Sequence, residues 1–209
     1  MTSAAGLLVV ARRGLSAKKP AKTEAEVGPA EDLMREHGVL RRVLFLYDEA
    51  ARQLDAGQKP PLDALAKGAG IVRKVIEQYH EKLEEQFIFP RMEEKLGELT
   101  AVLRRQHEAG RTVTARILKM CEGGDRSGLA EQLRAFNRMY RPHAAREDTV
   151  LFPAFHDLLG EKAWHELGEQ FEEIEKKQLG SEGFEGAVAQ VAKIEEQFGF
   201  ADLDQFTPR

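Results

Sequence analysis

A chain of 209 residues, 42% of them hydrophobic, is long enough to bury one substantial core, so one domain with appendages is the simplest expectation. Charged residues make up 32% of the chain and aromatic residues only 7%, a balance that favours amphipathic helices over a β-sandwich or β-barrel. The formal net charge is only −4 and no sustained basic block follows the amino-terminal segment, so we do not expect nucleic acid to be a principal partner.

The amino-terminal segment, residues 1–29, differs from the rest because it is basic and has no acidic residue before Glu24. We expect it to be flexible and to lie outside the fold. Its apolar run, residues 4–11, is too short to span a bilayer and precedes the arginines, whereas a secretory signal begins with its basic residues. We therefore expect a cytoplasmic protein, with export as the alternative if residues 7–17 are the remainder of a leader.

Apolar residues then recur at helical spacing in four stretches, which we assign to one domain at residues 30–160. The predicted helices span residues 30–54, 62–89, 99–121 and 127–159. Pro90 should end or bend the second helix, and Pro142 should kink the fourth.

The remaining residues, 161–209, read as a helical cap and tail. A weak helical period covers residues 161–178, glycines break it at 180–183, and a shorter helix follows at 184–198. No stretch alternates like a strand, so the sequence predicts an all-α fold.

Cysteine usage restricts the chemistry that this chain can perform. Cys121 is the only cysteine, so an internal disulfide, a thiolate metal site and a paired redox-cysteine mechanism are all excluded. Any metal must be held by nitrogen and oxygen ligands, which directs attention to the six histidines.

Two of these histidines begin a motif that occurs twice. Residues 80–90 and 143–153 both read His-x-x-x-Glu-acid-x-x-aliphatic-Phe-Pro. A shorter pattern is shared by the first and third predicted helices, Arg35-Glu36-His37 against Arg105-Gln106-His107. Each half of the domain is then one helix pair, and two pairs form a four-helix bundle with approximate twofold symmetry, an architecture in which inward side chains commonly build metal sites.

The spacing within the longer motif selects one glutamate in each copy. Residues four apart lie on nearly the same face of a helix, so Glu84 and Glu147 can each hold a metal together with their motif histidine. The acids that follow them, Glu85 and Asp148, should face away unless the helix deforms locally.

Burial makes metal binding the favoured interpretation. Two uncompensated glutamates in an apolar core would each cost on the order of several kcal/mol or shift their pKa strongly. Two divalent cations offset that cost, and four neutral imidazoles then supply two nitrogens to each cation. Bridging carboxylates favour iron or manganese over zinc, and we expect two non-haem iron ions.

The motif residues resemble the hemerythrin-like, HHE cation-binding domain over roughly residues 30–160. The resemblance implies an up-down four-helix bundle, here with two additional C-terminal helices, and a non-haem di-iron centre. By the same resemblance the metal ligands are His37, His80, Glu84, His107, His143 and Glu147.

One position departs from the oxygen-carrying hemerythrins. Those proteins place a second histidine four residues after the third-helix histidine, and this chain has Arg111 there. A set of four histidines looks more like the branch linked to nitric-oxide stress and iron-sulfur repair, which usually carries a cysteine-bearing amino-terminal domain. No cysteine precedes Cys121 in this chain.

Several neighbouring residues have two interpretations. Arg41 and Arg111 either pair with surface carboxylates, which we favour, or orient the ligand glutamates. Tyr140 either hydrogen-bonds an oxygen bound to the metal or is a core tyrosine with a satisfied hydroxyl. We expect His156 to lie at a helix end and His165 on the surface of the capping helix.

Three functional hypotheses follow from these residues. The first is a module that binds or senses a small diatomic ligand, oxygen or nitric oxide, or that holds iron. The second is a di-iron oxidoreductase that consumes peroxide or nitric oxide with electrons from an unidentified redox partner. The third is a helical scaffold without metal.

Overall fold

The computed structural model describes residues 28–208, in which all regular structure is helical and no strand occurs. Residues 1–27 of the predicted amino-terminal segment therefore lie outside the described residues. In chain order the helices are α1 (Pro29–Asp55), α2 (Leu62–Ile71), η1 (Val72–His80), α3 (Glu81–Leu83), η2 (Glu84–Ile88), α4 (Phe89–Glu122), α5 (Leu129–Arg146), η3 (Glu147–Leu151), α6 (Phe152–Leu158), α7 (Glu161–Leu179), α8 (Gly183–Phe198) and η4 (Leu203–Phe206). The all-α prediction is confirmed.

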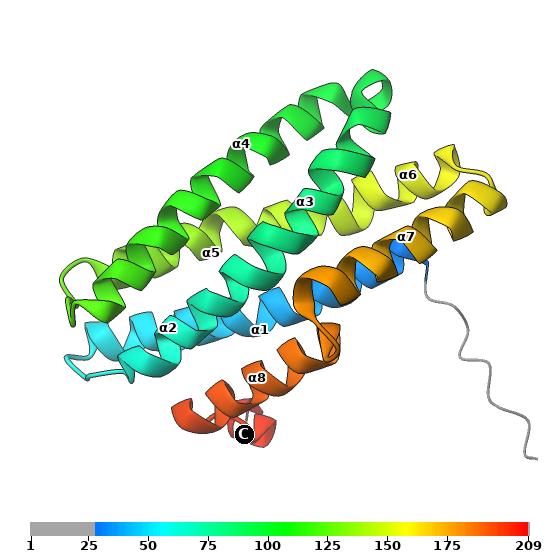
Figure 1. Cartoon of the computed structure of the whole chain (residues 1–209). Helices are drawn as coiled ribbons and strands as arrows, with labels where there is room; N and C mark the ends of the chain where they lie inside the picture. The colour runs from blue at the N-terminus through cyan, green and yellow to red at the C-terminus, as the bar shows by residue number, and fades with distance from the viewer. Residues whose placement is uncertain (1–27, 209) are drawn as a thin grey trace, which may run out of the picture.

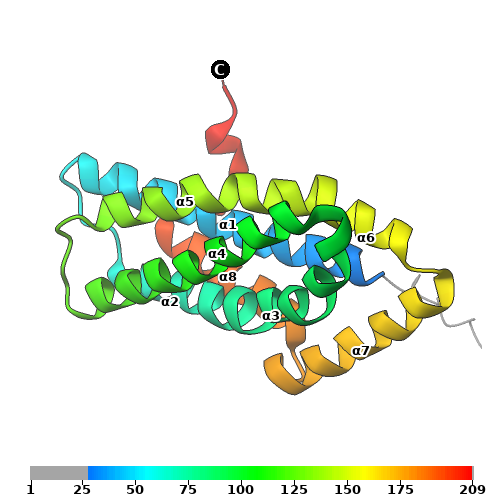
Figure 2. The same cartoon turned by 90° about the horizontal axis from the view of Figure 1, so that it is seen from above.

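The long helical stretches lie side by side, as Figures 1 and 2 show from two directions. α1 forms the first stretch, and α2 continues through η1, α3 and η2 as the second. The first turns of α4, up to the break at Leu96, complete the second stretch, and the rest of α4 provides the third. α5 continues through η3 and α6 as the fourth. Segments η1, η2 and η3 are π-helical, whereas η4 is a short 3₁₀ turn.

The reversal between the second and third stretches differs from the prediction at Pro90. Helical backbone continues past Pro90, and the break comes at Leu96, which has φ −137° and ψ 33°. Pro90 lies in the first turn of α4, directly after the π-helical segment η2, where its missing N–H group costs little. The expected end of the second helix, at Phe89, was thus placed about two turns too early.

The fourth stretch begins after Gly128, whose φ of 73° lies in the left-handed region that glycine adopts easily. α5 keeps its helical assignment through Pro142, so the backbone leaves α geometry only at Glu147, where η3 begins. The expected kink at Pro142 stays a prediction.

Two clusters of buried apolar side chains make up the core, and histidines separate them. On α1, Leu33 belongs to one cluster and Leu40 to the other, with His37 between them. On α4, Leu103 and Ile117 flank His107 in the same manner. A polar layer therefore crosses the interior where each long stretch passes from one apolar cluster to the other.

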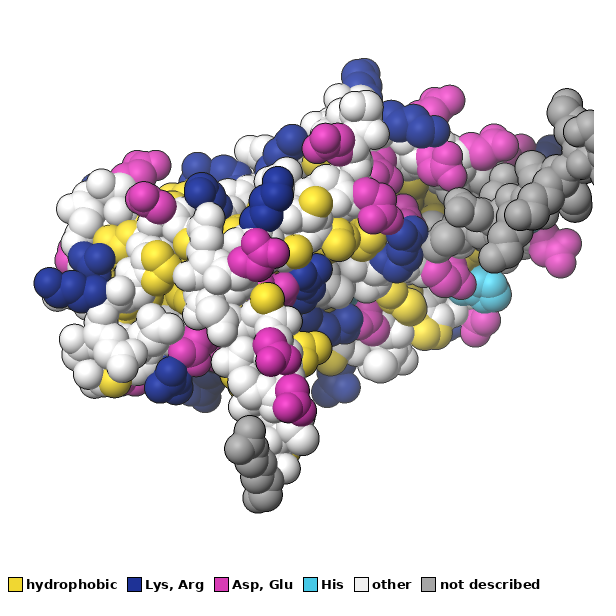
Figure 3. Space-filling view, turned by 90° about the horizontal axis from the view of Figure 1, so that it is seen from below, with side chains coloured by type: hydrophobic (Ala, Val, Ile, Leu, Met, Phe, Trp, Pro, Cys, Tyr) yellow, Lys and Arg dark blue, Asp and Glu magenta, His cyan; other side chains and the backbone are white. Residues whose placement is uncertain are grey.

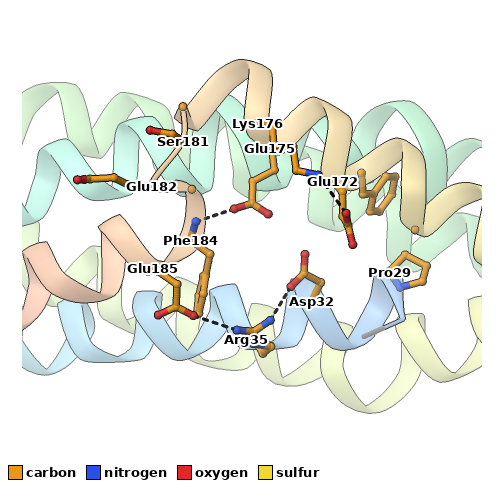
Figure 4. A pocket seen from close by; sticks show the side chains of 14 residues that line it. Pro29, Asp32, Arg35, Glu172, Glu175, Lys176, Ser181, Glu182, Phe184 and Glu185 are labelled. Atoms are coloured by element: carbon orange, nitrogen blue, oxygen red, sulfur yellow. Dashed lines mark hydrogen bonds and ion pairs between the residues drawn. The ribbon is translucent and has the colours of Figure 1, made fainter. Parts of the chain in front are cut away.

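The C-terminal helices pack against the outside of these stretches. α7 and α8 contact α1, and α8 also contacts α2. Between α1, α7 and α8 lies a polar pocket, shown in Figure 4, in which Arg35 pairs with Asp32 at 3.2 Å and with Glu185 at 3.4 Å. Across the same pocket the carboxylate of Glu175 accepts the backbone N–H of Phe184 at 2.6 Å. The Arg35–Glu185 pair connects α8 to α1, and the Glu175–Phe184 hydrogen bond connects α7 to α8.

Charges of both signs share the surface. On the face in Figure 3, basic and acidic side chains are interspersed among smaller apolar areas. No helix among residues 28–208 is long and apolar enough to cross a membrane.

The docking of α7 depends on Phe171, which is only 1% exposed and contacts the ring of Phe87 at 5.5 Å between centroids. We expect Phe171→Ala to lower the free energy of unfolding by about 3–5 kcal/mol, the usual cost of removing a buried phenylalanine ring. Urea denaturation measures this change in the free energy of unfolding. Leu203→Ala, at a residue 73% exposed, is the control and should change stability by less than about 0.5 kcal/mol. Equal effects of the two substitutions would show that α7 does not dock as described.

Candidate metal centre

The six side chains predicted as ligands converge in the polar layer, and all are buried. One group, the first cluster, contains His37, His80, Glu84 and Glu147; the second cluster contains His107, His143 and Glu147. Ligand-type atoms within each cluster lie within 4.8 Å of one another.

Glu84 reaches histidines of both clusters. Its Oε1 atom lies 3.6 Å from Nε2 of His80, and its Oε2 atom lies 3.4 Å from Nε2 of His107. One carboxylate therefore spans the gap between the clusters with one oxygen toward each.

Glu147 has the matching arrangement from the opposite side. Its Oε2 atom lies 3.4 Å from Nε2 of His37, and its Oε1 atom lies 3.0 Å from Nε2 of His143. The twofold relation that the repeated motif predicts is thus present in the geometry of the ligand-type atoms.

All four oxygens of these glutamates are buried, and none has a hydrogen-bond partner in the part of the chain that the structure describes. Buried carboxylate oxygens are normally satisfied, because an unpaired buried charge costs on the order of several kcal/mol. Oxygen and imidazole nitrogen atoms that face one another without donors between them are a suitable donor set for divalent cations. The residues present therefore fit a metal at each cluster.

The acids that follow the glutamates contribute to the site, and the expectation that they face away is wrong. Nδ1 of His37 lies 2.6 Å from Oδ1 of Asp148, and Nδ1 of His107 lies 3.1 Å from Oε1 of Glu85. Both acids hold the ring nitrogen that points away from the cluster.

Local helix geometry explains how these acids reach the histidines. The π-helical segments η2 and η3 begin at Glu84 and Glu147, the two predicted ligands. A π turn closes its hydrogen bonds over five residues instead of four, so a residue five positions after the motif histidine returns toward the same face. Pro90 and Pro153, six positions after the glutamates, were the sequence signal that could have revealed this deformation.

The motif histidines themselves are held by residues of the shorter pattern. Nδ1 of His80 lies 2.7 Å from Oε2 of Glu36, and Nδ1 of His143 lies 2.9 Å from Oε1 of Gln106. Burial raises the pKa of Glu36, and the hydrogen bond from His80 opposes that rise. Sequence reasoning missed both partners, although each directly precedes a predicted ligand.

These partners fix the tautomer of every histidine in the site. An ionised carboxylate or an amide oxygen only accepts, so the Nδ1 atom must carry the proton that is donated. Nε2 of each neutral imidazole then presents its lone pair to the cluster, as a metal ligand does. Nε2 of His107 and Nε2 of His143 lie only 3.2 Å apart, a repulsive pair of lone pairs unless a proton or a cation lies next to them.

Protons neutralise the glutamates when no cation does. Burial lowers the pKa of His107, but the nearby carboxylates of Glu84 and Glu85 outweigh it and raise that pKa to about 10. Burial raises the pKa of Glu84, but His80 and His107 outweigh it and hold that pKa well below its ordinary range. Cation uptake must displace these protons.

Comparison with known proteins identifies the family. Residues 28–155 match the hemerythrin HHE cation-binding domain. This chain belongs to the hemerythrin HHE family. Proteins described as uncharacterised, from Mycobacterium bovis and two strains of Mycobacterium tuberculosis, are each 41% identical over 222 aligned residues, covering 99% of this chain and 87% of the relative. No solved structure matches the chain significantly.

The family match spans both clusters, so the match and the geometry agree on cation binding. The match rests on the sequence, and the clusters rest on the positions of buried side chains. Within this hemerythrin HHE chain, the His and Glu groups described above are therefore the candidate ligands of the cation.

Two arginines stabilise the acids that hold the histidines. Arg41 pairs with Asp148, and Arg111 pairs with Glu85 and also with Glu81. Neither of the two interpretations of these arginines describes them fully, because their partners are neither free surface carboxylates nor the ligand glutamates. Each arginine instead acts on a carboxylate that orients a histidine.

Tyr140 matches the core interpretation. Its hydroxyl donates to Oε1 of Glu81 at 2.5 Å, away from the ligand glutamates. Gly110 permits this placement, because a Cβ atom there would lie 2.2 Å from the tyrosine oxygen. His156 and His165 are exposed and belong to neither cluster, as the sequence predicts.

We expect Asp148→Asn to weaken divalent cation binding by at least about 10-fold, because loss of a carboxylate partner lowers the basicity and ordering of a metal-binding histidine. Competition with a chelator of known affinity measures the change. Asp157→Asn, at a residue whose side chain is 75% exposed, is the matched control and should bind like the unaltered chain. Unchanged affinity in both variants would exclude a role for Asp148.

Proposed function

We propose that this hemerythrin HHE protein holds two iron ions in an up-down four-helix bundle and binds a small diatomic ligand, oxygen or nitric oxide. Its ligands are the six residues predicted from the sequence: His37, His80, Glu84, His107, His143 and Glu147. Two imidazoles and both glutamates are available to each ion.

One observation carries this proposal: each glutamate directs its two oxygens to histidines of different clusters. A single cation would satisfy one cluster and leave buried oxygens of both glutamates uncompensated on the other side. Two cations, with each glutamate bridging them, satisfy all four oxygens at once.

The donor set supports iron. It contains only imidazole and carboxylate groups, and bridging carboxylates between paired ions favour iron or manganese. The one thiol, Cys121, is buried in the apolar core cluster that contains Leu40 and Ile117, outside the polar layer. It therefore adds no soft ligand. Iron held here supplies the redox chemistry and the coordination position at which a diatomic gas binds.

The surroundings of the site support a small uncharged ligand. The ring of Phe152 stacks on His37 with 5.7 Å between centroids, and that of Phe89 stacks on His107 at 5.4 Å. These phenylalanines come from the two copies of the motif and place apolar walls beside the clusters. Such walls exclude water and charged substrates and admit oxygen or nitric oxide more readily.

Metal content tests the centre. Protein purified without an affinity tag and reconstituted with ferrous iron under anaerobic conditions should contain two irons per chain. His107→Ala should lose at least one of them because it removes a buried ligand, whereas His156→Ala, at a side chain 61% exposed, should retain both. Elemental analysis measures the ratio. Less than about one iron per chain in the unaltered protein would support the metal-free scaffold instead, since such ligand sets bind strongly.

Ligand binding is tested separately with the reduced, iron-loaded protein. Addition of nitric oxide or oxygen should change the visible absorption spectrum, and removal of the gas under argon should reverse the change. The oxidoreductase alternative predicts repeated consumption of nitric oxide or peroxide when a reductant is added. Irreversible oxidation with neither an adduct nor turnover would contradict both roles.

A further inference from the structure

The twofold symmetry of the centre is broken at one position next to it. The Nδ1 partners of His37 and His107 are both carboxylates, Asp148 and Glu85. The Nδ1 partners of the other two histidines differ, since His80 donates to Glu36 and His143 donates to Gln106. Glu36 and Gln106 occupy equivalent places in the repeat, each directly before a histidine of the site.

A carboxylate and an amide act differently on an imidazole. A hydrogen bond to an ionised acceptor is roughly twice as strong as one to a neutral acceptor, and it increases the electron density that the imidazole offers to a metal. His80, in the first cluster, is therefore a stronger donor toward a cation than His143 in the second cluster.

The charge of Glu36 also lacks the compensation that the other acids have. Asp148 is paired with Arg41, and Glu85 is paired with Lys82 and Arg111. Glu36 is only 1% exposed, and no lysine or arginine among residues 28–208 forms an ion pair with it.

Within residues 28–208 the one hydrogen-bond partner of the Glu36 carboxylate is His80, and its Oε1 atom has none. Oε2 of Glu36 thus holds the His80 ring through its Nδ1 atom, whereas Gln106 offers the matching nitrogen of His143 only an amide oxygen.

We propose that the two metal positions are inequivalent, with Glu36 making the first cluster the tighter position and Gln106 making the second cluster the weaker one. This inference rests on the proposed two-cation centre. The first cluster then fills first and retains its ion longest, and the second cluster is the position that exchanges its ion.

Two double variants isolate the positions. His107→Ala with His143→Ala leaves the first cluster, and His37→Ala with His80→Ala leaves the second. Each keeps both glutamates and can be titrated with Co²⁺ alone, whose visible absorption reports coordination. We expect the first-cluster variant to bind Co²⁺ about 10- to 100-fold more tightly, the range that metal-site hydrogen-bond partners usually control. Equal affinities, or the reverse order, would overturn the inference.

Exchanging the two partners tests the cause. Adding Glu36→Gln to the first-cluster variant should weaken Co²⁺ binding by about 10-fold or more, and adding Gln106→Glu to the second-cluster variant should strengthen it by a similar factor. A merely structural role predicts that both substitutions weaken binding. Because Gln106→Glu adds a carboxylate to a partly buried position, circular dichroism confirms its fold, and Glu36→Gln gives an independent answer if that variant is unfolded.

The outcomes separate this inference from the proposed function. If the unaltered chain binds fewer than two cations, the two-cation centre is wrong. If it binds two and the paired variants bind equally with either partner, the centre remains and only the inequivalence fails.

Discussion

The burial of two glutamates is the constraint on which the rest of the interior depends. Glu84 and Glu147 are fully buried, and no protein donor satisfies any of their four oxygens. Their charges must be neutralised by cations or by protons on the facing imidazoles, because uncompensated burial would cost on the order of several kcal/mol for each. The apolar core is therefore divided in two, and the long helices cross a polar layer that has to be compensated before they can pack.

The same layer makes the two halves of the domain dependent on each other. Each copy of the long motif supports a histidine of the opposite half: the copy in the second stretch supplies Glu85 and Phe89 to His107, and the other copy supplies Asp148 and Phe152 to His37. The first cluster includes Glu147 from the other helix pair, and Glu84 directs one oxygen toward His107 of the second cluster. The site can therefore assemble fully only when both copies of the motif are in place.

The sequence predicted the helices and the convergence of the six ligand-type residues because both depend on regular α-helical spacing. It failed where the backbone departs from that spacing. Glu85 and Asp148 were expected to face away, yet the π-helical segments turn them toward the histidines. Pro90 was expected to end or bend the second helix, which instead continues to a break at Leu96. Glu36 was missed for another reason: its role exists only across helices, where its carboxylate meets His80.

Arg111 shows how a single substitution can leave the ligand set symmetric while the surroundings differ. The oxygen-carrying hemerythrins, from which the sequence departs at this position, have a histidine there, whereas the arginine here pairs with Glu85 and Glu81. Its guanidinium is paired with two carboxylates and has no lone pair for a cation, so it gives neither cluster an additional ligand. In the proposed two-cation centre each position has two histidines and shares both glutamates, so a difference between the positions would have to arise outside the ligands. The contrast between a carboxylate at Glu36 and an amide at Gln106 is the one that acts directly on a candidate ligand histidine.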